Sequence, residues 1–552
     1  MRTRLLVLRR ALLRPSVQSS PLRTFTQNTP VRLPLRTRPH LPFLSVPTAS
    51  RQRVRYLTTQ RGSWLRYEIT LGVKYIVYIG IGIASCVGIA FSFHQESLER
   101  EYPTPHEWSF FTRVRFRIAL GQRDLRDPPG GNTDWVAIIQ HIQATVQRLE
   151  DVRIDGLLVA DSPDGPGKDI TAKPEPWRRG YFEALMAYAK AAEYVDGWQL
   201  DKKRGIVFPP ALVVGPDNPF PAAIPAGSAT APKQEDCETA YPSPAVIYQQ
   251  ILGTTGLNSR QRIEANLAYA TWLEYSRDLA AAESCFQSAL AVAASDSPAQ
   301  PFDSNTYVLK ESAGVPSQNV LKTITEYATF RARKGDVEGA LPILVSILKA
   351  RKSLPLTGST AQAATAAVNP LEDPFSKLWR FLKGSFAPPA YPPPPSDGLS
   401  PPTYTPLERC EEAALHLYIG EIMYTANAAS REEGLAWTRD AVDLAEEQLH
   451  KLKSAGAHDD RAAKTTCREC LTTGLGNWAN MVERLAQEEV VKRKDQSTKS
   501  SGWFALWGDS KIQDLGRWTA EGKVILERER RLKELLEDLE PPKNGFSSLF
   551  QV

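Results

Sequence analysis

The sequence predicts an all-α protein: a helical-repeat solenoid carried by one N-terminal membrane helix, with a disordered presequence and a Pro-rich linker. Three observations support this fold class. Residues Tyr75–Phe93 are nineteen uncharged, mostly apolar residues. The arm before them holds arginines and no acidic residue up to Glu68, and alanine-rich amphipathic stretches recur after them.

The apolar run Tyr75–Phe93 is long enough to cross a bilayer once. Nineteen residues span roughly 28 Å as a helix, close to the hydrocarbon thickness of a membrane. A buried core helix is the alternative, but such helices are usually shorter and carry a polar stripe. Gly80, Ala84 and Gly88 recur every four residues, which indicates a face for close packing on another membrane helix, although small residues are common in such spans.

The N-terminal arm has the composition of a mitochondrial presequence. Residues 1–57 contain twelve arginines and no acid, and a disordered basic tail is the alternative. Residues 58–74 are then expected in the matrix, because cations favour that side. The formal charge is +5; removing +12 for residues 1–57 and +2 for residues 58–93 leaves −9 beyond the run. This balance disfavours nucleic-acid binding.

The juxtamembrane segment, residues 94–131, contains a short helix predicted within Pro103–Gly121, either at the membrane interface or docked on the body. The soluble fold is expected to begin with a helix at Asp134–Glu150, followed by a helix at Trp177–Tyr194. The loop Asp161–Thr171 contains a Gly-Lys pair but lacks the spacing of a phosphate-binding P-loop.

Two stretches predict pairs of antiparallel helices. In Arg260–Ala294 the turn falls near Asp278, and in residues 320–350 it falls at Gly335-Asp336. Both resemble the tetratricopeptide repeat (TPR), which has small residues at positions 8 and 20, an aromatic at 24 and alanine at 27. The matching residues are Ala270, Ala282, Phe286 and Ala289 in the first copy and Ala328, Ala340, Leu344 and Ile347 in the second. An ordinary helical hairpin is the alternative for either copy alone.

Weaker copies are predicted from Cys410 and from Leu475-Gly476. The segments are then residues 1–57 (presequence), 58–74 (matrix arm), 75–93 (membrane helix), 94–131 (juxtamembrane), 132–355 (TPR-like repeats), 356–406 (Pro-rich linker), 407–540 (C-terminal TPR-like helices) and 541–552 (tail). The linker includes a basic aromatic stretch, Phe375–Phe386; a similar stretch lies at Trp503–Gly508, and a final helix is expected at Lys511–Leu539.

No residues with catalytic, cofactor-binding or metal-binding spacing stand out, so we expect a protein that is not an enzyme and needs no cofactor. Cys467 and Cys470 have metal or redox spacing, but zinc requires two more ligands, and Cys410 supplies at most one. Two cysteines three apart on a helix are more often small buried residues. Six cysteines in this long chain do not indicate a disulfide scaffold.

The presequence, the single anchor, the juxtamembrane EYPTPHEW, the degenerate TPR array and CRECLTTGLGNW together resemble the TPR adaptor subunit of the mitochondrial i-AAA protease complex, in its fungal form. The resemblance implies a body in the intermembrane space that binds unfolded or unassembled proteins and delivers them to a membrane-anchored AAA protease, with a co-adaptor. In TPRs generally the first helix lines a peptide groove. The candidates here are Glu264, Thr271, Glu274, Tyr275, Lys322, Thr329 and Arg333.

Two other functions fit parts of the sequence. An outer-membrane TPR import receptor would hold a terminal carboxylate with lysine at position 5 and asparagine at position 9. This chain has Leu267 with Thr271, Thr325 with Thr329 and Leu417 with Glu421 at those positions, so the clamp is missing in all three. A respiratory-complex assembly scaffold fits the anchor and the repeats equally well.

Overall fold

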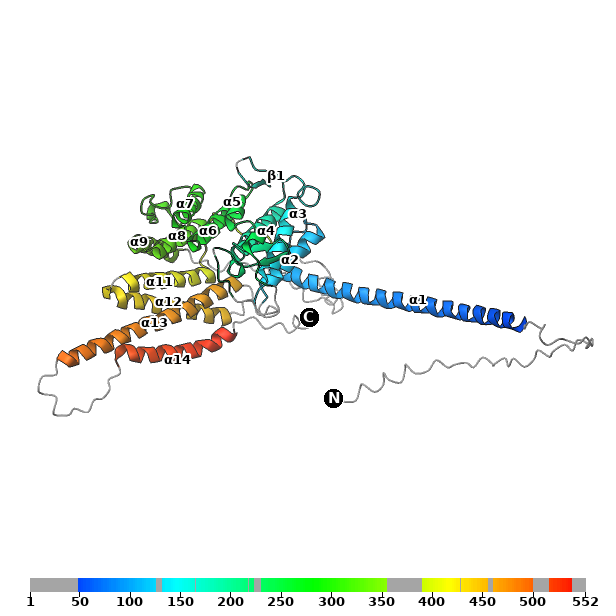
Figure 1. Cartoon of the computed structure of the whole chain (residues 1–552). Helices are drawn as coiled ribbons and strands as arrows, with labels where there is room; N and C mark the ends of the chain where they lie inside the picture. Colours follow the sequence, from blue (N-terminus) through cyan, green and yellow to red (C-terminus); the bar gives the residue numbers. More distant parts are fainter. Residues whose placement is uncertain are drawn as a thin grey trace, which may run out of the picture. The chain divides into compact units, whose positions relative to one another are not determined.

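The computed structural model describes residues 48–125, 132–163, 165–216, 218–222, 230–354, 390–426, 428–454, 460–499 and 516–538. This part of the chain is mostly helical, as predicted (Figure 1). It divides into two compact units, one ending at Phe91 and one beginning at Ser92. Most of the predicted presequence and the stretches Phe375–Phe386 and Trp503–Gly508 lie outside the described residues.

The first unit is one long helix, α1 (Thr48–Glu101), whose last ten residues belong to the second unit. Its stretch Gly62–Glu101 is long and apolar enough to cross a membrane. The predicted matrix arm, residues 58–74, continues this helix rather than forming a separate segment. Gly80, Ala84 and Gly88 are exposed on it, and a Cβ added at Gly80 would meet no atom within 4 Å.

The second unit begins with four helices around one apolar core: α2 (Phe110–Arg123), α3 (Trp135–Glu150), α4 (Glu175–Tyr194) and α5 (Pro244–Leu252). Trp177 and Tyr181 of α4 stack within this core, with ring centres 5.2 Å apart, and both are fully buried. Asp134 caps α3 by accepting from the amides of its first turn. The predicted juxtamembrane helix is therefore α2, and its inner face is docked on the body.

Short strands interrupt the helices, which the all-α prediction missed. β1 (Ala160–Asp161) pairs with β2 (Lys168–Asp169). β3 (Gln199–Asp201) pairs antiparallel with both β4 (Ile206–Phe208) and β5 (Cys237–Thr239). These ladders of two or three residues are too short to give the period-two pattern from which strands are predicted.

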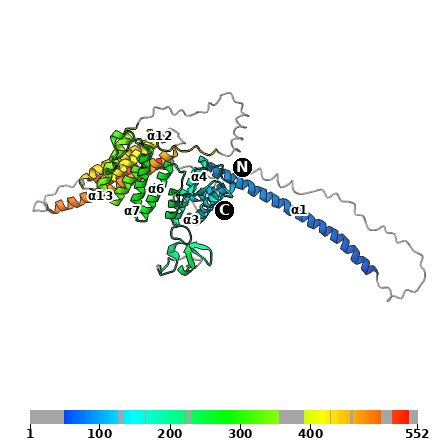
Figure 2. The same cartoon turned by 90° about the horizontal axis from the view of Figure 1, so that it is seen from above.

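The two predicted helical pairs are present. They are α6 (Ser259–Tyr275) with α7 (Leu279–Ser295), and α8 (Gln318–Lys334) with α9 (Val337–Lys352). Asp278 caps α7 by accepting from the Ala281 amide at 3.1 Å. Gly335 ends α8 at φ +100°, where glycine avoids the strain of a side chain. Seen from above, α6 and α7 lie side by side (Figure 2).

The C-terminal helices are α11 (Pro406–Ala426), α12 (Arg431–Ser454), α13 (Arg461–Lys499) and α14 (Arg517–Asp538). The predicted start of a fourth pair at Leu475-Gly476 is wrong, because both residues lie inside the continuous α13. The nearby Gly474 marks a close approach rather than a break, since its Cβ would lie 2.9 Å from Val442 Cγ2.

A buried disulfide between Cys410 and Cys467 joins α11 to α13. Cys467 and Cys470 are both buried, as expected, but the pairing with a residue 57 positions away was not predicted. Burial raises the pKa of the Cys470 thiol to about 12, so it stays protonated near neutral pH. Among the described residues no group of three His, Cys, Asp or Glu side chains could hold a metal ion.

The close contact of α11 with α12 depends on two glycines. A Cβ at Gly420 would lie 2.8 Å from the Gly434 carbonyl oxygen, a rigid neighbour. We expect Gly420→Ala to lower the free energy of unfolding by about 1–3 kcal/mol, as overpacking does. At Gly476 a Cβ would meet nothing within 4 Å, so the control Gly476→Ala should raise it by about 0.5–1 kcal/mol. Chemical unfolding measures both, and equal effects would contradict the close contact.

Candidate functional site

The first helices of consecutive pairs form one layer. α4 contacts α6, and α6 contacts α8. The second helix of each pair contacts the first helix of the next pair: α5 contacts α6, α7 contacts α8, and α9 contacts α11. We call α4, α6 and α8 the first-helix row. Because the helices of each pair are antiparallel neighbours, the row presents the amino-terminal ends of its helices along one edge.

The Pro-rich segment, residues 390–405, lies across these amino-terminal ends. It forms neither helix nor strand, as predicted, but it is docked on the body and is not a free spacer. At α4, the Arg179 guanidinium carbon lies 4.2 Å from the ring centre of Tyr391, a cation–π contact. Arg179 Nη2 also donates to the Pro392 carbonyl oxygen at 2.6 Å.

The same segment continues past α6 and α8. Arg260 Nη1 of α6 donates to the Ser396 carbonyl oxygen at 2.8 Å, and Asn319 Nδ2 of α8 donates to the Asp397 carbonyl oxygen at 2.8 Å. The backbone amides of Gln318 and Asn319 donate to the segment too. Their acceptors are the carbonyl oxygens of Ser400 at 3.1 Å and Gly398 at 3.0 Å.

These contacts follow from helix chemistry. The first-turn amides of a helix have no acceptor within the helix, so a passing chain with free carbonyl oxygens can satisfy them. Two main-chain carbonyl oxygens of the docked segment accept in this way from the first turn of α8, and three more accept from the side chains of Arg179, Arg260 and Asn319. Every residue has a backbone carbonyl, so these hydrogen bonds make few demands on the bound sequence, whereas the approach at Gly398 requires glycine and the contact with Arg179 requires an aromatic ring.

The seven predicted groove residues do not line one common groove in the structure. Glu274 of α6 and Arg333 of α8 form an ion pair with two hydrogen bonds of 2.6 and 2.8 Å. Tyr275 is 86% exposed, and Lys322 is exposed as well. Thr329 is buried and its hydroxyl donates to the Glu326 carbonyl oxygen at 2.9 Å, so it does not face a groove.

Glu264 and Thr271, the remaining two, line a hollow of about 480 Å³ between α2, α4, α5 and α6. Glu183 of α4 lines the same hollow. Loss of hydration there raises the pKa of Glu183 to about 7, with Glu264 adding to the shift and Arg179 opposing it. The sequence pattern did not indicate Glu183, because the match to the TPR pattern begins only at α6 and Glu183 lies on α4.

Burial also raises the pKa of Glu326 on α8 and of Glu421 on α11. Arg333 and Lys322 oppose the shift of Glu326, and Asn477 donates a hydrogen bond to Glu421. Glu326 lies one turn from both Lys322 and Thr329, so the helical period could have indicated it. By surface area Glu183 and Glu326 are exposed and Glu421 is half-buried, so these carboxyl groups lie at the surface rather than in the core.

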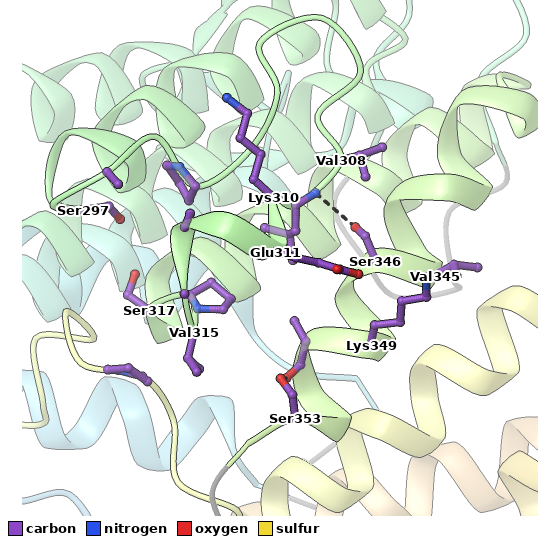
Figure 3. Close-up of a pocket in the computed structure, with 18 of the residues that line it drawn as sticks. Ser297, Val308, Lys310, Glu311, Val315, Ser317, Val345, Ser346, Lys349 and Ser353 are labelled. Atoms are coloured by element: carbon purple, nitrogen blue, oxygen red, sulfur yellow. Dashed lines mark hydrogen bonds between the residues drawn. The ribbon is translucent and has the colours of Figure 1, made fainter.

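A larger hollow, of about 950 Å³, lies between the α7–α8 connection and α9 (Figure 3). Val308, Val315 and Val345 line it with several prolines, and Lys310, Glu311 and Lys349 add charge. The Leu309 amide donates to Ser346 Oγ at 3.3 Å and ties the connection to α9. Leu399 and Pro401 of the docked segment complete the wall, and none of the seven predicted residues reaches it.

Gly398 allows the docked segment to approach α8. Its φ is +71°, and a Cβ there would lie 2.1 Å from Asn319 Oδ1. We expect Gly398→Ala to release the segment, to raise hydrogen exchange at the Gln318 and Asn319 amides about tenfold or more, and to cost about 1–3 kcal/mol of stability.

The matched control is Gly197→Ala. Gly197 has φ +73°, but a Cβ there would meet no atom within 4 Å. It shares the backbone strain without the clash, so it should leave exchange at the start of α8 unchanged. Equal exchange in both variants, measured by mass spectrometry on the intact chain, would show that the segment is not held by this approach.

Comparisons of the chain with models of protein families, with curated proteins and with solved structures return no match. The chain's own residues therefore provide the indications of function. The site they define is a row of helix ends that holds a non-helical polypeptide by its main chain, next to a hollow lined by carboxyl groups.

Proposed function

We propose that this chain is a non-catalytic adaptor of the mitochondrial inner membrane. Its α1 anchors it, with the N-terminus in the matrix and the body in the intermembrane space. The body is a TPR-like solenoid that binds unfolded or unassembled proteins and delivers them, with a co-adaptor, to a membrane-anchored i-AAA protease. The chain carries no hydrolytic site of its own in this proposal.

The docked segment is the observation that carries the proposal. A surface that already holds sixteen residues of non-helical chain through backbone carbonyl oxygens has the chemistry to hold other unfolded chains. Recognition of the main chain accepts many sequences, which a quality-control adaptor requires. Stacking of helical pairs supports the TPR-like assignment, because one pair alone cannot bury its apolar face.

The disulfide supports the location. Cys410 and Cys467 are paired and buried, and structural disulfides persist in oxidising compartments and are rare in the cytosol. A body facing the cytosol, as in an outer-membrane import receptor, is therefore disfavoured. The arginine-rich arm before α1 and the membrane-length stretch within α1 are consistent with an inner-membrane anchor.

Affinity purification of the full chain from mild detergent tests the proposal. We expect a AAA protease to co-purify, and loss of the chain to slow turnover of an unassembled subunit several-fold in a pulse–chase. Recovery of respiratory subunits alone would contradict the proposal and favour an assembly scaffold.

The side of the membrane on which the body lies provides a second test of the proposal. Added protease should leave the body intact in organelles with a sealed outer membrane and digest it once that membrane is ruptured. Digestion of the body in sealed organelles would indicate a cytosol-facing receptor instead.

A further inference from the structure

Two segments that meet where α2 begins expose six large apolar side chains. Phe110 and Phe111 occupy the first turn of α2 and are 56% and 65% exposed. The loop after α3 contributes Val152, Ile154, Leu157 and Leu158, which are 41–65% exposed. We call these six residues the apolar patch. Single exposed apolar residues need no explanation, but a contiguous group of this kind marks a contact surface.

Asp155 holds the two segments of the patch together. Its Oδ1 accepts from the Ser109 amide at 2.9 Å, and its Oδ2 accepts from the hydroxyls of Ser109 at 2.8 Å and Thr112 at 2.6 Å. Phe110 and Phe111 lie between Ser109 and Thr112, and Ile154 adjoins Asp155. The buried, fully bonded carboxylate therefore fixes the apolar residues of both segments on one surface.

The backbone of the loop is crowded and strained around this surface. Leu158 has φ +70°, a conformation that leucine rarely adopts. A Cβ at Gly156 would lie 2.6 Å from the Glu150 carbonyl group, so only glycine fits there. Packing in a core usually offsets such strain, yet Leu157 and Leu158 are more than 60% exposed. Turn hydrogen bonds hold this backbone, such as that from the Val159 amide to the Gly156 carbonyl oxygen at 2.9 Å, and they leave both leucine side chains exposed.

Two features favour lipid as the occupant of this patch. Arg115 is exposed one turn after Phe111 on α2, Arg153 is exposed in the loop, and cations near aromatic and aliphatic side chains suit the headgroup region of a bilayer. The patch also follows the membrane-length stretch closely along the chain. Phe110 is seventeen residues after Phe93, so even a fully extended connection would reach only about 60 Å.

We infer that the apolar patch inserts into the surface of the bilayer that α1 crosses, as a second membrane contact of the body. The six apolar side chains would enter the boundary between headgroups and acyl chains, and Arg115 and Arg153 would meet lipid phosphates. This inference requires the membrane anchor but not the adaptor function, so the two can fail separately.

Photolabelling of the full chain in vesicles tests the inference. The vesicles would contain phosphatidylcholine, phosphatidylglycerol and a phospholipid with a diazirine in the upper acyl chain. Tryptic peptides 101–113 and 154–168 contain most of the patch, and peptide 263–277 contains the highly exposed Tyr275 as a control. We expect about tenfold more lipid adducts on the two patch peptides than on the control peptide.

A variant with Phe110→Ser, Phe111→Ser, Leu157→Ser and Leu158→Ser should lose these adducts, whereas Tyr275→Ser should change nothing. Adducts at the same yield on all three peptides of the unaltered chain would overturn the inference, whether or not the variant folds. So would absence of lipid adducts together with chemical cross-links from the patch to another protein, which would identify a protein interface instead.

Discussion

The fold of this body depends on hydrogen-bond acceptors for the free amides at the starts of its helices. Each helix begins with amides that its own turns cannot satisfy, and leaving such groups buried and unpaired is costly. Asp134, Asp278 and Asp336 supply side-chain caps at α3, α7 and α9. At α8 the acceptors include carbonyl oxygens from residues about 80 positions further along the chain. The docked segment thus closes an edge that the helical pairs leave open.

The same docking joins the two halves of the body. The chain leaves α9 at Lys352, and the docked segment runs along α4, α6 and α8 before it enters α11, which itself packs on α9. A buried ion pair between Arg351 of α9 and Glu408 of α11 adds a second connection. Arg351 also pairs with Glu411, so removing Arg351 rather than Glu408 would leave a buried charge uncompensated, which is strongly destabilising.

Local features could be predicted from the sequence, because neighbouring residues encode them. The turns at Asp278 and Gly335 follow from capping and from left-handed glycine, and the apolar face of α3 follows from its helical period. The docked segment could not be predicted, since Arg179 and Tyr391 are 212 positions apart and a Pro-rich stretch does not specify its partner. The disulfide and the apolar patch likewise depend on tertiary proximity, and Leu475-Gly476 suggested a turn where packing keeps α13 continuous.

In the proposed function, the first-helix row binds unfolded chains by their main chain. The most direct test is to measure hydrogen exchange of the full protein in a lipid nanodisc, with and without a permanently unfolded polypeptide. If the polypeptide takes the place of the docked segment, we expect residues 390–405 to exchange faster, while the Gln318 and Asn319 amides at the start of α8 stay protected. Unchanged exchange of residues 390–405, or protection confined to α9 and the α7–α8 connection around the larger hollow, would contradict it.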